Sequence, residues 1–170
     1  MIREYGPILL IPAAWIMSFL TMVYPGIDTY WIAHMHYFIT GFLAVFALTS
    51  WKKMDKPVLK TWRLVILLGI FATAAGAVSF HIQDFSSIFG GISVFYWLLA
   101  PGLASYYTSE SLGEYSKAFR FTGYGGITAF LLFLQGVVVD SQIFLAAGII
   151  TAIVSQTSSI VLAARMDGNI

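Results

Sequence analysis

The sequence predicts an all-α integral membrane protein, a bundle of six transmembrane helices with both termini cytoplasmic. Of its 170 residues, 59% are hydrophobic and only 10% are charged, whereas soluble domains carry about 25% charged residues. Six apolar runs each approach the roughly 20 residues that cross a bilayer core as a helix. The connections between these runs alternate between basic and cation-free, which gives the bundle an orientation.

The first run, 7–24, begins at Pro7, a residue that suits the first turn of a helix. No small-residue cleavage site follows it, so we expect a helix rather than a removed signal peptide. The fourth run contains Pro101-Gly102, which predicts a kink. We expect one helical domain over 1–170, with neighbouring helices antiparallel because the connections are short. The remaining runs are 29–51, 61–81, 89–107, 119–139 and 141–164.

All nine lysines and arginines fall on one side of this bundle. The connections on the opposite side carry none, and cytoplasmic connections are the ones enriched in these residues. We therefore expect a multi-pass protein of the cell membrane with both ends inside. The nine cations are Arg3, Lys52, Lys53, Lys56, Lys60, Arg63, Lys117, Arg120 and Arg165.

Several functional classes are excluded by residues that the chain lacks. It has no cysteine, which removes disulfides, thiolate metal sites, iron–sulfur clusters and covalently attached haem. It also has no Walker loop, GxSxG or HExxH motif, so a conventional hydrolase or ATP-driven machine is not supported. We expect an accessory or electron-transfer subunit whose partners are the lipid bilayer and a larger membrane complex or a second copy, not nucleic acid.

The candidate site consists of the chain's three histidines. His34 and His36 lie in run 29–51, and His81 ends the next run. An antiparallel pair of helices places His34 and His81 in the same outer leaflet at similar depths. Two residues turn a helix by about 200°, so only one of His34 and His36 can face the third helix. Ionisable residues within a membrane are functional by default, although interfacial histidines bonded to backbone are the alternative.

Copper is the first ligand that this pattern predicts. Imidazoles suit copper and thioethers suit Cu(I). The expected ligands are His34, His36, His81, Met35 and Met22.

The outer side also carries three aspartates and no cation, which favours entry of a metal ion. Asp28, Asp84 and Asp140 each lie close to the start of an inward-running helix. Capping of those helices is the alternative explanation for all three.

Haem b is the second ligand, held between His81 and either His34 or His36. Ala77 and Ala74 would leave room for the macrocycle, but the outer side offers no cation for the propionates. Such a protein would transfer electrons from quinol. A chain without a ligand is the third alternative.

A small transporter or channel subunit is a further alternative. It would use the kink at Pro101-Gly102 and the polar run Ser155-Gln156-Thr157-Ser158-Ser159. Such a run more often makes hydrogen bonds between helices.

Two short stretches, His34-Met35-His36 and Phe-Tyr-Trp-Leu-Leu-Ala-Pro at 95–101, resemble the CtaG-type cytochrome oxidase assembly factors. The chain is also similar in size and number of spans to small archaeal membrane proteins that accompany respiratory complexes. The resemblance implies an accessory or assembly subunit of a respiratory or other copper-dependent membrane enzyme, with copper near the outer surface.

Overall fold

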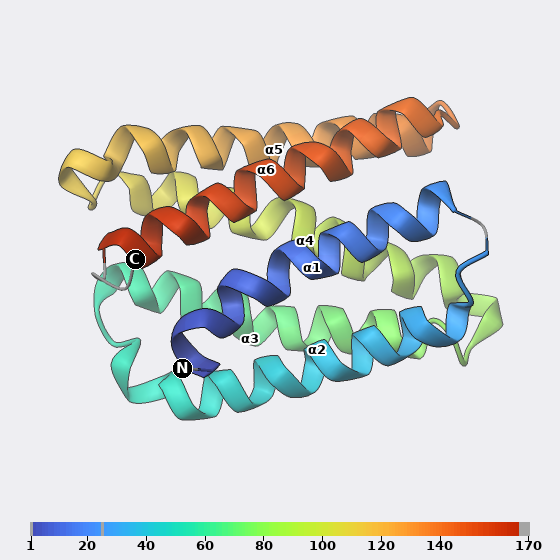
Figure 1. Cartoon of the computed structure of the whole chain (residues 1–170), viewed down its shortest axis with the longest axis horizontal. Helices are drawn as coiled ribbons and strands as arrows, with labels where there is room; N and C mark the ends of the chain where they lie inside the picture. The colour runs from blue at the N-terminus through green and yellow to red at the C-terminus, as the bar shows by residue number, and fades with distance from the viewer. Residues whose placement is uncertain (1, 25, 167–170) are drawn as a thin grey trace. The chain divides into compact units, whose positions relative to one another are not determined.

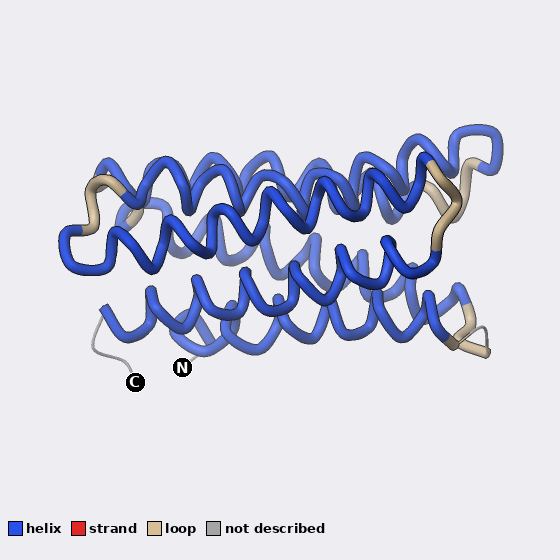
Figure 2. Tube along the Cα trace, turned by 90° about the horizontal axis from the view of Figure 1, so that it is seen from above, coloured by secondary structure: helices blue, strands red, loops and turns tan. Residues whose placement is uncertain are grey.

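The computed structural model describes residues 2–24 and 26–166, and their side chains from Leu9 onward. Within these residues the chain consists of helices joined by short turns, without a strand (Figures 1 and 2). The predicted all-α fold is therefore confirmed. The six long helices are α1 (Ile2–Val23), α2 (Thr29–Ser50), α3 (Pro57–Val78), α4 (Ser86–Ser109), α5 (Ser116–Val138) and α6 (Gln142–Met166). Single 3₁₀ turns are η1 (Trp51–Lys53), η2 (Gln83–Phe85) and η3 (Gly113–Tyr115).

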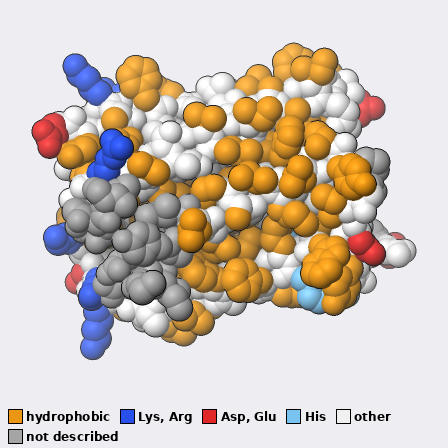
Figure 3. All heavy atoms as spheres, viewed as in Figure 1, with side chains coloured by type: hydrophobic (Ala, Val, Ile, Leu, Met, Phe, Trp, Pro, Cys, Tyr) orange, Lys and Arg blue, Asp and Glu red, His pale blue; other side chains and the backbone are white. Residues whose placement is uncertain are grey.

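Five helices, α2 to α6 with their adjoining 3₁₀ turns, are long and apolar enough to cross a membrane. The apolar part of α1 for which side chains are described, Leu9–Val23, is shorter than a full span. The structure thus confirms a membrane protein and five of the six predicted spans by length and composition. Apolar side chains cover much of the face seen in Figure 3, and charged groups lie toward the helix ends.

The chain packs as two compact units. Unit 1 consists of Met1–Val23 and Leu98–Ile170, and unit 2 of Tyr24–Trp97. Helix α4 contributes its first half to unit 2 and its second half to unit 1, and it stays helical through Pro101. The single helical domain expected over 1–170 stays a prediction.

Unit 1 is built on close approaches between glycines and neighbouring backbone. A Cβ on Gly126 of α5 would lie 2.6 Å from the Cα of Gly102 on α4. In the α5–α6 hairpin, a Cβ on Gly148 would lie 2.9 Å from the carbonyl oxygen of Ala129. Close backbone contact of this kind is a main source of helix association in membranes.

In unit 2, the α2–α3 hairpin sets the position of the candidate site. Helix α3 begins at Pro57, four residues before the predicted start at Thr61, because proline lacks the N–H that a first helical residue leaves unpaired. It ends at Val78, where the hydroxyl of Ser79 donates to the carbonyl of Gly76 at 2.7 Å. His81 therefore lies in the turn after α3 rather than in the helix.

Within each unit, the described cations gather at one end of the helices. In unit 2 they lie along the α2–α3 connection, away from His34 and His81. In unit 1 they lie in the first turns of α5 and the last turn of α6. This arrangement agrees with the predicted orientation, although the side chain of Arg3 lies outside the described residues.

Candidate functional site

Tyr37 of α2 contacts two of the three histidines. Its hydroxyl is hydrogen-bonded to Nε2 of His81, and the two rings are stacked with centroids 6.1 Å apart and planes at 28°. The ring of His34 meets Tyr37 edge-on, with centroids 5.9 Å apart and planes at 88°. His34, Tyr37 and His81 are called the His–Tyr–His cluster below. The expectation that His34 and His81 lie at the same end of the hairpin is thus met.

The ring of His34 is fixed by its own helix. Its Nδ1 lies 2.8 Å from the carbonyl oxygen of Tyr30, and the Tyr30 ring lies 3.9 Å away between centroids. A carbonyl oxygen only accepts, so Nδ1 carries the proton and a neutral ring keeps its lone pair on Nε2. His34 is exposed, so this nitrogen belongs to an accessible imidazole. Asp28 caps the same helix, since its Oδ1 accepts from the backbone N–H of Tyr30 at 2.8 Å.

His36 points in a different direction and is half-buried. Its Nδ1 donates to the carbonyl of Ile32 at 2.9 Å, and its ring lies 5.7 Å from that of Phe80. A Cβ on Gly76 of α3 would lie 2.6 Å from Nε2 of His36 and 2.8 Å from Oγ of Ser93. Only a glycine therefore leaves room for this ring. The prediction that one of the two α2 histidines faces the third helix is borne out by His36.

The expected copper ligands are not assembled into a ready-made group. Among the residues that the structure describes, no three His, Cys, Asp or Glu side chains could hold a metal ion together. Met35 is half-buried beside His36, and Met22 lies on α1 in unit 1. Copper stays a prediction. His34 and His36 both make the hydrogen bond to backbone that the alternative expected.

Two alanines were expected to leave room for a haem beside His81. Ala77 has only 4% of its surface exposed and Ala74 is half-buried. The haem alternative therefore stays a prediction.

The three outer aspartates differ in role. Asp28 is the N-cap of α2, as the capping alternative predicted. Asp84 is exposed in η2. Asp140 follows Val139, the C-cap of α5, and has φ at 49°. The N–H of Ser141 donates to the carbonyl of Gly136 at 2.9 Å, the pattern of a Schellman motif.

The polar run of α6 makes hydrogen bonds within its own helix and one to α1. Oγ of Ser159 donates to the carbonyl of Gln156 at 2.8 Å, and Nε1 of Trp15 on α1 donates to Oε1 of Gln156 at 2.9 Å. Trp15 is 6% and Gln156 is 4% exposed. These bonds are what a structural role for the run predicts, and the transporter alternative stays a prediction.

Tyr30 and Tyr37 contact histidines of the site in a way that the sequence alone did not predict. They stand four residues before and three residues after His34, and both spacings place side chains on one face of a helix. Because aromatic residues occur throughout this chain, that spacing alone does not mark a site without the hairpin partner His81.

Comparison with protein-family models, curated protein sequences and solved structures finds no match to this chain. The resemblance to the CtaG-type factors therefore stays an expectation from the sequence.

Proposed function

We propose that this chain is an accessory subunit of a respiratory or other copper-dependent enzyme complex in the cell membrane, and that it holds copper near the outer surface. The observation that supports the proposal most is that His34 on α2 and His81 in the turn after α3 both contact Tyr37. Two imidazoles and a phenol at one end of a hairpin are a donor set that a copper ion can use.

The hydrogen bond of His34 suits a metal ligand. Ligating histidines almost always donate their second ring N–H to a carbonyl or carboxylate, which fixes the tautomer and orients the ring. Nδ1 of His34 makes such a bond to Tyr30. Because the Tyr37 ring contacts both histidines, an ion shared by them requires this ring to turn aside. His36 makes the same kind of bond but lies against Gly76, so we place it outside the copper site.

The surroundings of the cluster favour a cation. The segment just before α2 carries Asp28, and the segment just after α3 carries Asp84. Neither segment carries a lysine or arginine. An accessory role is supported by the small amount of chain outside the helices, since short turns leave little room for a separate extramembrane domain.

Copper content measured on variants tests the site. The chain is purified in mild detergent, loaded with Cu(I) under reducing conditions, and assayed by elemental analysis. We expect one copper per chain in the wild type, loss in His34→Gln and in His81→Gln, and retention in the matched control His36→Gln. Absence of copper from the loaded wild type, or equal loss in all three variants, would overturn the assignment.

An electron-transfer role with quinol and haem b is a second candidate. The specific observation in its favour is the hydrogen-bonded pair of Tyr37 and His81, because a phenol–imidazole pair can accept a proton from a quinol. An optical spectrum of the same purified protein separates the two. A Soret band that disappears in His81→Ala would support haem, whereas a colourless protein with stoichiometric copper supports the first proposal.

The partner is tested separately by gentle extraction and native electrophoresis. We expect the chain to migrate within a larger assembly or as a multimer of itself. Migration as a single chain would count against an accessory role without touching the copper site.

A further inference from the structure

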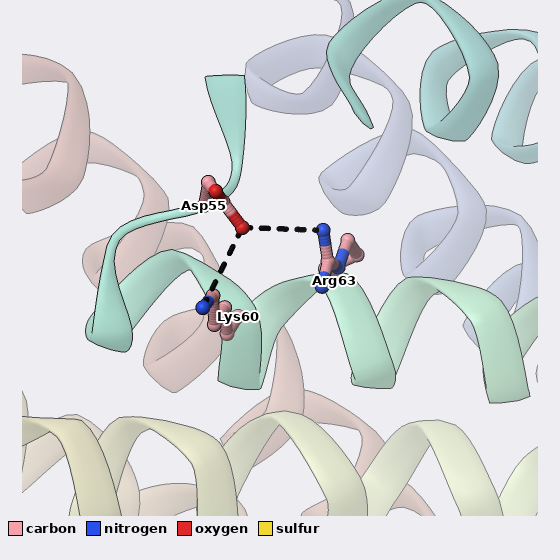
Figure 4. A network of polar contacts seen from close by, with 3 residues as sticks. All are labelled: Asp55, Lys60 and Arg63. Atoms are coloured by element: carbon pink, nitrogen blue, oxygen red, sulfur yellow. Dashed lines mark ion pairs between the residues drawn. The ribbon is translucent and has the colours of Figure 1, made fainter. Parts of the chain in front are cut away.

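The connection between α2 and α3, together with the first two turns of α3, carries five cations and one carboxylate. The cations, called the basic corner below, are Lys52, Lys53, Lys56, Lys60 and Arg63. Oδ1 of Asp55 lies 3.5 Å from Nζ of Lys60 and 3.9 Å from Nη1 of Arg63 (Figure 4). The other three lysines are exposed and form no ion pair with any residue that the structure describes. The corner therefore keeps a positive charge that its own carboxylate does not neutralise.

Arg63 links the two sides of the corner. Its guanidinium carbon lies 4.4 Å from the centroid of the Trp51 ring, a cation–π contact between α3 and η1. The Arg63 side chain is only 23% exposed, whereas that of Lys60 is 54% exposed. Because Asp55 and Trp51 both hold Arg63, the connection has a defined shape rather than the freedom of an open loop.

The start of α3 adds to the attraction for anions. Lys56 is the N-cap of this helix, and its side chain makes no capping hydrogen bond. The first N–H groups of a helix point along its axis and carry partial positive charge, which favours phosphate groups. These N–H groups and the lysines of the corner lie on the same connection.

Apolar side chains flank the corner on both helices. Leu48 on α2 is 79% exposed, and Leu64 on α3, next to Arg63, is 56% exposed. Val45 and Leu68 continue these two exposed apolar rows along the helices. A soluble anion gains nothing from such rows, whereas a phospholipid has acyl chains that match them.

We infer that the basic corner binds the phosphate headgroup of an acidic phospholipid, whose acyl chains lie along Leu48 and Leu64. Clusters of lysine and arginine beside transmembrane helices recognise anionic lipids, and each cation contributes measurably to the attraction. The site is at the opposite end of the hairpin from the His–Tyr–His cluster. Its test is therefore independent of copper binding.

Lipid binding is measured on the full chain, purified and delipidated in mild detergent. Phosphatidylglycerol and phosphatidylcholine with identical brominated acyl chains are titrated in turn, and quenching of tryptophan fluorescence gives the affinity. We expect phosphatidylglycerol to bind at least tenfold more tightly than phosphatidylcholine, and inorganic phosphate to compete poorly. Equal binding of the two lipids overturns the inference. Competition by phosphate at the concentration of the lipid would assign a soluble anion site and overturn it as well.

Variants locate the binding. The triple substitution Lys52→Gln, Lys53→Gln, Lys56→Gln is expected to weaken phosphatidylglycerol binding on the order of 100-fold, about fivefold for each lysine. The matched control removes the same charge from unit 1, through Lys117→Gln, Arg120→Gln and Arg165→Gln, and should bind nearly as the wild type does. Equal weakening in the two triple variants would show a general charge effect and overturn the assignment.

Asp55→Asn tests the same site by a gain rather than a loss. It releases Lys60 and Arg63 from their carboxylate, so it should tighten binding of phosphatidylglycerol several-fold. This variant keeps every cation and remains informative even if a triple variant fails to fold. Unchanged or weaker binding in Asp55→Asn would contradict the inference.

Discussion

The hydroxyl of Tyr37 is hydrogen-bonded to Nε2 of His81 across the α2–α3 hairpin, between residues 44 positions apart in the chain. We expect Tyr37→Phe to lower the free energy of unfolding by about 0.5–1.5 kcal/mol, the usual net value of one such bond. Unfolding by SDS titration in mixed micelles measures this change. Tyr30→Phe is the matched control, because the structure shows no hydrogen bond of the Tyr30 hydroxyl to a described residue. Equal loss in both variants would mean that the bond to His81 contributes nothing.

Gly76→Ala should disturb His36. The new Cβ would lie 2.6 Å from Nε2 of His36 and 2.8 Å from Oγ of Ser93, closer than any real contact. We expect the free energy of unfolding to fall by about 1–3 kcal/mol, as overpacking of a filled core does.

Gly41→Ala on α2 is the control for this prediction, because nothing lies within 4 Å of the place that its new methyl group would take. Alanine is the better helix former, so this variant should be unchanged or more stable by up to about 1 kcal/mol. If both alanine variants behaved alike, the placement of His36 against Gly76 would be wrong.

The bond between Trp15 and Gln156 should show coupling in a double-mutant cycle. Nε1 of Trp15 donates to Oε1 of Gln156 within unit 1, and both side chains are buried. Trp15→Phe, Gln156→Leu and the double variant, each unfolded by SDS titration, should give an interaction free energy of about 0.6–2 kcal/mol. If the effects of the two single substitutions on the free energy of unfolding simply add in the double variant, α1 and α6 associate through other contacts.

Ser50→Ala should not destabilise the chain. Ser50 is 4% exposed at the end of α2, and its hydroxyl has no hydrogen-bond partner among the described residues. Removing a buried hydroxyl that is unpaired costs nothing in bonding and gains helix propensity, so we expect stability to rise by about 0.5–1 kcal/mol. A fall in the melting temperature would reveal a partner for this hydroxyl.

Much of the fold could be predicted from the sequence because the backbone hydrogen bonds of a membrane helix are made within the helix itself. Each helix must pair its own backbone N–H and C=O groups within an apolar run long enough to cross the bilayer. The runs of α2 to α6 meet this requirement. Helix ends were less accurate. Pro57 starts α3 earlier than the apolar run does, since the charged residues Lys60 and Arg63 can lie in the first two turns of a helix at the membrane surface.

The candidate site was predictable only in part. That His34 and His81 lie at the same end of the hairpin follows from antiparallel helices of similar length. That His36 points away from His34 follows from the helical period. Tyr37 could not be found in this way, because its contact with His81 depends on the rotation of α2 against α3. That rotation is set by packing of Gly76 against His36, a contact between residues far apart in the sequence.

X-ray absorption of the Cu(I)-loaded chain tests the proposed copper site most directly, because the multiple-scattering signal of imidazole counts the histidine ligands. The account predicts two imidazoles in the wild type and in His36→Gln, and no bound copper in His34→Gln or in His81→Gln. Fewer than two imidazoles in the wild type, or loss of an imidazole in His36→Gln, would contradict it.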